Sequence, residues 1–109
     1  MWVGVPEPEV NPSLLDENGS FLAMPDLAWP EYMFAIEYEG DHHRGVDQYR
    51  RDIRRIERLI DAGWSVMKIS ADDLFDRPDE TVARVARRLT ARGWTPQRRE
   101  LRRIGHVRR

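Results

Sequence analysis

Residues 25–39, PDLAWPEYMFAIEYE, decide the fold of this chain because they hold two apolar runs separated by a turn. In the second run, bulky side chains alternate with small or acidic ones: Phe34, Ile36 and Tyr38 in one set, and Ala35, Glu37 and Glu39 in the other. This period of two predicts a strand over 32–39. Pro30 has no N–H to donate to a sheet, so it belongs in the turn. The stretch therefore predicts a hairpin with one apolar and one acidic face.

The register of this hairpin can also be predicted. A turn over 30–33 would set Trp29 against Phe34 and would bring Asp26 opposite Glu37. Cross-strand Cβ atoms lie ~5 Å apart, and like charges placed opposite each other destabilise a hairpin. A divalent cation would offset this repulsion, because hard carboxylate oxygens suit Mg²⁺. The alternative is a solvated acidic face that binds nothing.

Charge is divided unevenly along the chain. The first 43 residues contain nine Asp or Glu and no Lys or Arg, whereas all 18 Lys and Arg lie at or after Arg44. A formal net charge of -1 therefore conceals an acidic segment and a basic one. An acidic segment can collect a divalent cation, and an arginine-rich segment can hold a polyanion.

Composition sets further bounds. A chain of 109 residues suits one domain with a modest core. Because it contains no cysteine, disulfides and thiolate zinc sites are excluded. No apolar run is long enough for a membrane span, and the first residues lack the basic and apolar regions of a signal peptide. We therefore expect a cytoplasmic protein with no membrane partner.

The periodicity along the chain predicts an α/β (α+β) fold with a mixed sheet and the order β-β-β-α-β-α. Strands are expected at 13–16, 21–29, 32–39 and 64–70, and helices at 47–62 and 78–92. Asn18-Gly19 between the first two strands indicates a hairpin turn, because both residues accept positive φ. The expected organisation is an irregular arm over 1–12, a folded domain over 13–93 and a basic tail over 94–109.

The segment from residue 25 to residue 70 resembles the core of a PD-(D/E)XK nuclease. More closely, it is similar to an uncharacterised-domain family related to very-short-patch-repair endonucleases, which is found largely in bacteria and often in actinobacterial proteins. The matching features are an aspartate on the second strand, a Glu-rich run ending in His, an Arg-Asp pair and a Gly-Trp pair. They are Asp26, Glu37–His43, Arg51-Asp52 and Gly63-Trp64, and the resemblance covers roughly residues 4–92.

This resemblance implies a restriction-endonuclease-like domain, without the usual first helix, that cleaves DNA with Mg²⁺ or Mn²⁺. It implies that Asp26 and Glu37 ligate the metal, with the carbonyl of Tyr38 as a third ligand. The catalytic residues that it implies are Asp26, Glu37, Glu39, His43 and Gln48. Glu39 stands where the superfamily has a lysine, so Lys68, the only lysine of the chain, is a candidate to supply that charge from a neighbouring strand.

Nucleic-acid contacts are expected from basic side chains after the acidic run: Arg44, Arg51, Arg54, Arg55 and Lys68. Arginine–phosphate contacts give affinity without reading sequence. A solvated helix face is the alternative for these arginines. Two other functions stay open from the sequence, a catalytically inactive nuclease-fold module that binds DNA or regulates, and a structural domain that binds another protein. A protein partner or a homodimer is compatible with each.

Overall fold

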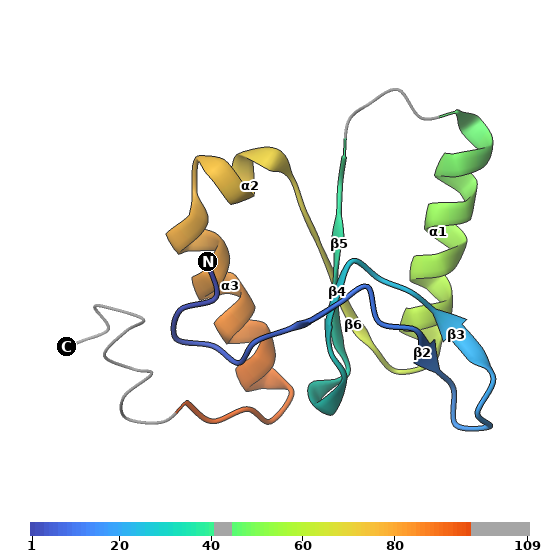
Figure 1. Cartoon of the computed structure of the whole chain (residues 1–109), viewed down its shortest axis with the longest axis horizontal. Helices are drawn as coiled ribbons and strands as arrows, with labels where there is room; N and C mark the ends of the chain where they lie inside the picture. The colour runs from blue at the N-terminus through green and yellow to red at the C-terminus, as the bar shows by residue number, and fades with distance from the viewer. Residues whose placement is uncertain (41–44, 97–109) are drawn as a thin grey trace.

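A computed structural model describes residues 1–40 and 45–96, which form a four-stranded mixed sheet with helices on both faces (Figure 1). The elements in chain order are β1 (Glu9–Val10), β2 (Leu14–Leu15), β3 (Phe21–Ala23), β4 (Leu27–Trp29), the 3₁₀ turn η1 (Pro30–Tyr32), β5 (Phe34–Tyr38), α1 (Val46–Asp61), β6 (Ser65–Ile69), α2 (Ala71–Phe75) and α3 (Pro78–Ala91). The α+β class expected from the sequence is confirmed. Among the described helices, none combines the length and apolar character needed to cross a membrane.

The sheet has the strand order β1-β4-β5-β6, and β2 and β3 form a separate two-stranded sheet. β4 runs antiparallel to β5, whereas β6 runs parallel to β5. A parallel pair needs a crossover connection, and α1 provides it. The strand-helix-strand unit that the sequence predicted is therefore present.

The register of the β4–β5 hairpin is the predicted one. The facing pairs are Leu27 with Ile36, Ala28 with Ala35, and Trp29 with Phe34. The turn is tight because the N–H of Met33 donates to the carbonyl of Pro30 at 3.1 Å, and Met33 takes a left-handed φ of 50°. Since successive side chains of a strand point to opposite faces, Glu37 shares its face with Ala35.

The prediction of one continuous strand over 21–29 is wrong. Residues 24–26 separate β3 from β4, and the buried Pro25 in this gap has no N–H for a ladder hydrogen bond. β3 instead pairs with β2 across the Asn18-Gly19 turn, where Gly19 has a φ of 84°. The Asp16 carboxylate accepts the N–H groups of Asn18 and Ser20 at 2.9 Å each. The predicted hairpin at this turn is confirmed.

The segment 1–12, expected as an irregular arm, joins the fold. Its strand β1 pairs with β4 at the edge of the sheet. Val5 is buried in the core, and Trp2 packs edge-on against Trp29 with ring centroids 5.4 Å apart. The indole N–H of Trp29 also donates to the carbonyl of Pro6 at 2.8 Å. Apolar and aromatic contacts therefore hold the segment in place.

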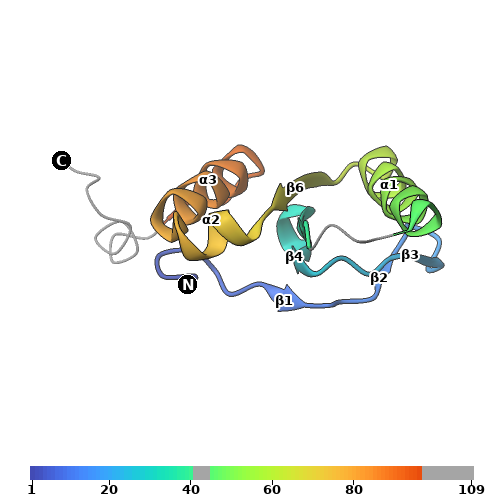
Figure 2. The same cartoon turned by 90° about the horizontal axis from the view of Figure 1, so that it is seen from above.

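The helices cover different faces of the sheet, with α1 on one face and α2 and α3 on the other (Figures 1 and 2). The α3 face is filled by bulky apolar side chains: Trp29, Phe34, Ile36, Met67, Ile69, Val82, Val85, Leu89 and Trp94. The α1 face has a smaller core: Leu14, Ala23, Ala28, Ala35, Leu59 and Trp64. The apolar face expected for the hairpin is thus the α3 face. The acidic face, which also carries Ala28 and Ala35, is the α1 face.

Two local features differ from the sequence prediction. Helical spacing predicts an apolar stripe on α1 made of Tyr49, Ile53, Ile56, Leu59 and Ile60. This stripe is only partly buried, because Tyr49 and Ile60 are exposed and Asp52 is buried instead. The short helix α2 was not expected. Ser70 begins it with a capping box, in which the N–H of Ser70 donates to Asp73 at 2.8 Å.

Candidate functional site

The two predicted acids lie at the same end of β4 and β5. Asp26 immediately precedes β4, and its Oδ2 accepts the backbone N–H of Tyr38 at 2.6 Å. This bond holds the Asp26 carboxylate beside the residue that follows Glu37. The negative charge of Asp26 is also close enough to contribute to a raised pKa of Glu37. The structure therefore brings Asp26 and Glu37 together, as the hairpin register predicted.

Glu37 is a buried acid, with 3% of its surface exposed. Burial is the largest cause that raises its pKa above the ordinary value, and the charge of Asp26 adds to it. Hydrogen bonding and charge from Arg55 oppose this shift, as does the charge of Lys68. The net direction is upward, so burial outweighs the two cations.

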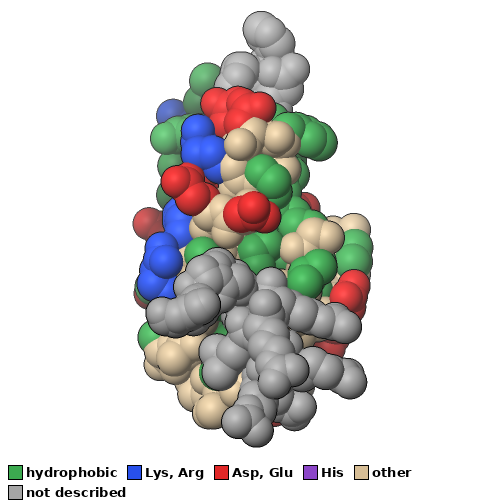
Figure 3. Space-filling model, turned by 90° about the vertical axis from the view of Figure 1, so that its left-hand side faces the viewer, with side chains coloured by type: hydrophobic (Ala, Val, Ile, Leu, Met, Phe, Trp, Pro, Cys, Tyr) green, Lys and Arg blue, Asp and Glu red, His purple; other side chains and the backbone are tan. Residues whose placement is uncertain are grey.

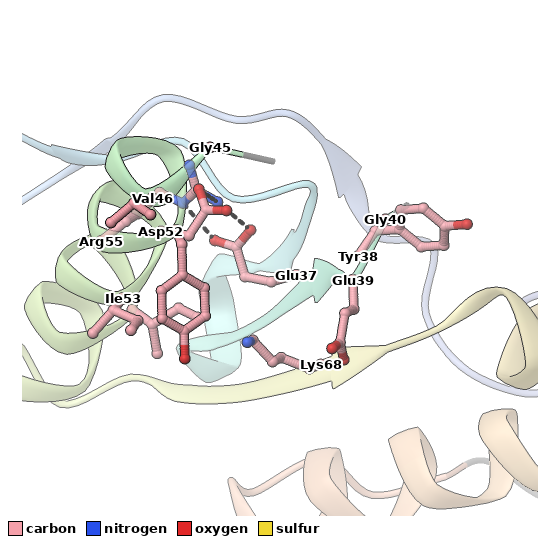
Figure 4. A pocket seen from close by; sticks show the side chains of 12 residues that line it. Glu37, Tyr38, Glu39, Gly40, Gly45, Val46, Asp52, Ile53, Arg55 and Lys68 are labelled. Carbon is pink, nitrogen blue, oxygen red and sulfur yellow. Dashed lines mark hydrogen bonds and ion pairs between the residues drawn. The ribbon is translucent and has the colours of Figure 1, made fainter. Parts of the chain in front are cut away.

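Arg55 binds Glu37 through a two-pronged ion pair. Its Nε donates to Oε2 and its Nη2 to Oε1, both at 2.9 Å (Figure 4). Such paired hydrogen bonds fix geometry as well as charge. Only 29% of the Arg55 side chain is exposed, so solvent screens the pair less than a surface ion pair. Arg55, predicted as a phosphate contact, is therefore also the counter-ion of Glu37.

A polar chain on α1 supports Arg55. Asp52 is buried, and its Oδ1 lies 3.3 Å from Arg55 Nη2. Gln48 donates to the same oxygen at 2.9 Å, and Arg51 donates to Gln48 Oε1 at 3.0 Å. Residues 48, 52 and 55 are spaced at i, i+4 and i+7, which places them on one helix face. That spacing was the sequence signal for this chain of contacts, which we had not predicted.

Lys68 stands beside Glu37 in the sheet. The parallel register of β5 and β6 pairs Glu37 with Lys68. In Figure 4 the Lys68 amine projects toward the α1 side, near Glu37, whereas the Tyr38 ring points away from the acids. Glu39 follows the end of β5, and its carboxylate extends toward β6. Lys68 is thus the basic group from a neighbouring strand that the sequence suggested.

A cavity of about 350 Å³ lies over these groups, between the first half of α1 and the ends of β5 and β6. Its charged lining is Glu37, Glu39, Asp52, Arg55 and Lys68, and its apolar lining includes Val46, Tyr49, Ile53 and Ile56. The cavity lining therefore combines side chains of both charge signs with apolar side chains. It is large enough for a phosphate-sized group with its water.

The remaining predicted residues fall into two groups. Gln48 contacts Asp52, while Arg51 and Arg54 lie on exposed turns of α1. His43 and Arg44 lie outside the described residues. The basic tail is described only as far as residue 96, and within it Trp94 is buried in the core.

The chemistry of the acids fits a magnesium ion that keeps several waters. Within residues 1–40 and 45–96, no group of three or more His, Cys, Asp or Glu side chains gathers around one point. Mg²⁺, however, is usually bound through one or two carboxylates and several waters. A carboxylate has about four lone-pair sites. Arg55 takes two on Glu37 and Tyr38 takes one on Asp26, so both acids keep sites for a cation.

Two curated proteins are similar to this chain, and both are named as uncharacterised proteins of Mycobacterium tuberculosis, one from each of two strains. Each is 34% identical over 87 residues, which is 79% of this chain and 32% of the relative. The chain therefore spans about a third of the length of these relatives. No family model matches the chain, and no solved structure matches it. The names of these relatives state no activity.

Proposed function

We propose that this domain cleaves phosphodiester bonds of DNA in a reaction that needs Mg²⁺ or Mn²⁺. The observation that carries the proposal is the meeting of Asp26, which immediately precedes β4, with Glu37 of β5, while Lys68 of β6 is paired with Glu37 in the sheet. Two carboxylates can hold a catalytic metal ion, and a lysine beside them can stabilise negative charge on a phosphodiester. The resemblance to PD-(D/E)XK nucleases points to Asp26 and Glu37, and Lys68 would supply from β6 the charge of the superfamily lysine, whose position is held by Glu39.

The arrangement of the sheet supports the finer fold assignment. An antiparallel hairpin, a crossover helix and a parallel strand follow one another along the chain, and helices cover both faces. The acid pair lies in the hairpin, next to the strand to which the crossover helix returns. This is the arrangement implied by the resemblance to restriction-endonuclease-like domains. The cytoplasmic location expected from the sequence stays a prediction.

Asp26 and Glu37 would hold the metal ion, with the carbonyl of Tyr38 as the third ligand implied by the resemblance. When bound, this ion supplies a water of lowered pKa and draws charge from the phosphate. Lys68 places a positive charge next to Glu37, where it can bind a non-bridging phosphate oxygen. Arg55 keeps Glu37 oriented and opposes the rise in its pKa. Glu39, at the rim of the cavity, can accept a proton from water.

A second candidate function is a nuclease-fold module that binds DNA without turnover. The observation that favours it is the pairing of both Glu37 oxygens with Arg55. With a hydrogen bond to each of its oxygens, the buried acid already has a counter-ion and requires no cation. In this alternative, the arginines of α1 would bind phosphate and the acid pair would serve only the structure.

A plasmid-nicking assay separates the two functions. We expect the full chain to nick supercoiled DNA with Mg²⁺ or Mn²⁺ and to lose this activity in EDTA. Glu37→Gln should abolish nicking, because the neutral amide replaces the anionic ligand. Glu31→Gln, an exposed acid in η1, is the matched control and should keep full activity. Nicking that survives in Glu37→Gln, or binding without any metal-dependent nicking, would contradict cleavage by this site.

A further inference from the structure

A second hollow, which shares Arg55 with the carboxylate cavity, lies between α1 and the β3–β4 segment. It has a volume of about 440 Å³, and its lining is Phe21, Ala23, Met24, Gln48, Arg51, Arg54, Arg55 and Arg58. We call it the arginine groove. β3 and α1 lie side by side in both ribbon views (Figures 1 and 2). Arg58 fixes this arrangement, because its Nε donates to the carbonyl of Leu22 at 3.3 Å.

The charge of the arginine groove is entirely of one sign. Its four arginines lie at positions i, i+3, i+4 and i+7 of α1, which is one face of the helix. Of the described residues that line it, none is Asp or Glu. The α2/α3 side differs, because acidic and basic side chains lie next to one another there (Figure 3), with Arg77 and Arg84 both paired to Asp73. The arginine groove is therefore complementary to a polyanion.

Exposed apolar side chains sit among these arginines. Phe21 is 60% exposed and Met24 is 47% exposed, and both line the groove. An exposed ring beside several guanidinium groups matches a strand of unpaired bases, because stacking needs a free base face and the backbone supplies one phosphate per nucleotide. In a duplex the base faces are stacked on each other, so Phe21 would have no equivalent partner.

We propose that the arginine groove binds single-stranded nucleic acid, with Arg51, Arg54 and Arg58 contacting phosphates and Phe21 stacking on a base. The inference deepens the proposed cleavage function and rests on it in one respect. Arg55 lines both the groove and the carboxylate cavity, so a strand in the groove would continue toward Glu37. The form of nucleic acid that the site receives would then be a single strand or an unpaired segment.

The test is fluorescence anisotropy with a labelled oligothymidine and a duplex of equal length, using the full chain in EDTA. We expect the single strand to bind more tightly than the duplex at equal salt. Phe21→Ala should weaken single-strand binding roughly 10-fold, as expected for the loss of one stacked base. Phe75→Ala is the matched control, since Phe75 is 78% exposed on α2, on the other side of the sheet. Phe21→Trp should retain binding.

A second pair of variants, one in the groove and one control, tests the phosphate contacts. Arg54→Ala should weaken binding and should lower the salt slope by about 0.7, the value for one phosphate contact on a single strand. Arg87→Ala removes an exposed arginine of α3 and should leave both quantities close to wild type. Equal effects of Arg54→Ala and Arg87→Ala would show that charge acts without a defined groove and would overturn the proposal.

Other outcomes are equally decisive. A duplex that binds more tightly than the single strand, with no change in Phe21→Ala, would overturn single-strand recognition and leave a duplex-phosphate surface. Because binding is measured in EDTA, it does not depend on a metal ion. A chain that binds oligothymidine through Phe21 but never nicks DNA would contradict only the cleavage function. A chain that nicks DNA while Phe21→Ala binds normally would contradict only the groove.

Discussion

The two faces of β5 carry different kinds of side chain. Phe34 and Ile36 point toward α3 and are fully buried among apolar side chains. Ala35 and Glu37, which alternate with them, point toward α1. On that side the apolar core is smaller, and the end of the strand opens into a cavity with a charged network. One strand thus stabilises the fold with one face and presents ionisable groups with the other.

The difference between the two faces indicates that the chain is less stable than it could be at position 37, on the α1 face. An apolar residue at position 37 would extend the α1-side core, since Ala28, Ala35 and Leu59 already pack there. Instead the chain buries an acid and compensates with Arg55. Replacing a buried ion pair by apolar residues is often neutral or stabilising. A buried charged pair in this position is therefore evidence for a functional demand.

The largest expected effect concerns the α3 face. Phe34→Ala removes a fully buried ring that stacks on Trp29 with centroids 5.2 Å apart. We expect a loss of about 3–5 kcal/mol in the free energy of unfolding, measured by urea denaturation. Phe75→Ala, at an exposed position, should change it by less than ~0.5 kcal/mol. Equal effects of the two substitutions would mean that the α3 face is not the stabilising core.

The next effect concerns the ion pair of the α1 face. Arg55→Met leaves Glu37 buried without its counter-ion, and we expect a loss of about 2 kcal/mol at neutral pH, reduced from the fully buried case because Arg55 is partly exposed. The double variant with Glu37→Gln should recover much of this loss. A double-mutant cycle in urea gives the coupling energy. Additive losses would show that the pair contributes no coupling.

The pH dependence of folding stability should have opposite signs for Glu37, on the α1 face, and Asp73, on the α3 face. The pKa of Glu37 is raised above 4.5, so the folded state holds its proton more tightly than the unfolded state does. The stabilisation that Glu37 contributes is therefore present below about pH 4.5, and it is lost as the pH rises through the raised pKa of the folded state. The pKa of Asp73 is lowered below 3.8, chiefly by the Ser70 backbone hydrogen bond, so its contribution is lost as the pH falls below that value.

Thermal melting between pH 3 and pH 8, a range set by these shifts, checks both signs. The Tm of Glu37→Gln should rise relative to wild type as the pH increases above about 4.5. The Tm of Asp73→Asn should approach that of wild type as the pH falls below about 3.8. Parallel curves for wild type and Glu37→Gln would show that Glu37 titrates normally in the folded protein.

The smallest effect on stability is expected at Lys68. Its side chain is exposed at the cavity, so Lys68→Met should change the free energy of unfolding by less than ~0.5 kcal/mol. If Lys68 binds phosphate, the same variant should reduce nicking by a factor of about 100, a typical cost of removing one charge-stabilising group. Retained nicking in a normally folded Lys68→Met would place Lys68 outside the reaction.

The sequence predicted the hairpin register because Pro30 fixed the turn and the alternation of Phe34 to Glu37 fixed the faces. It also predicted the acid pair, which follows directly from that register. The division into β3 and β4 was missed, although Pro25 was a visible signal that the ladder had to break there. One strand was predicted because most residues over 21–29 are apolar, which favours a single continuous strand.

The ion pair of Arg55 with Glu37 could not be predicted from the sequence. Five arginines lie between positions 50 and 58, and helical periodicity alone does not say which one reaches the sheet. That choice depends on the packing of α1 through Leu59 onto the small residues Ala28 and Ala35. The arginine groove was missed for the same reason, because it needs β3 to lie beside α1. Both features are tertiary, and the local pattern does not encode them.

Metal titration followed by thermal melting tests the central claim most directly. If Asp26 and Glu37 hold a cation, the Tm of wild type and of the Glu31→Gln control should rise with Mg²⁺ or Mn²⁺. The stabilisation should approach about 2.7 kcal/mol when the metal reaches 100 times its Kd. Asp26→Asn should show no such rise. An equal response of all three proteins, or no response from any, would contradict the claim that these two carboxylates form a metal site.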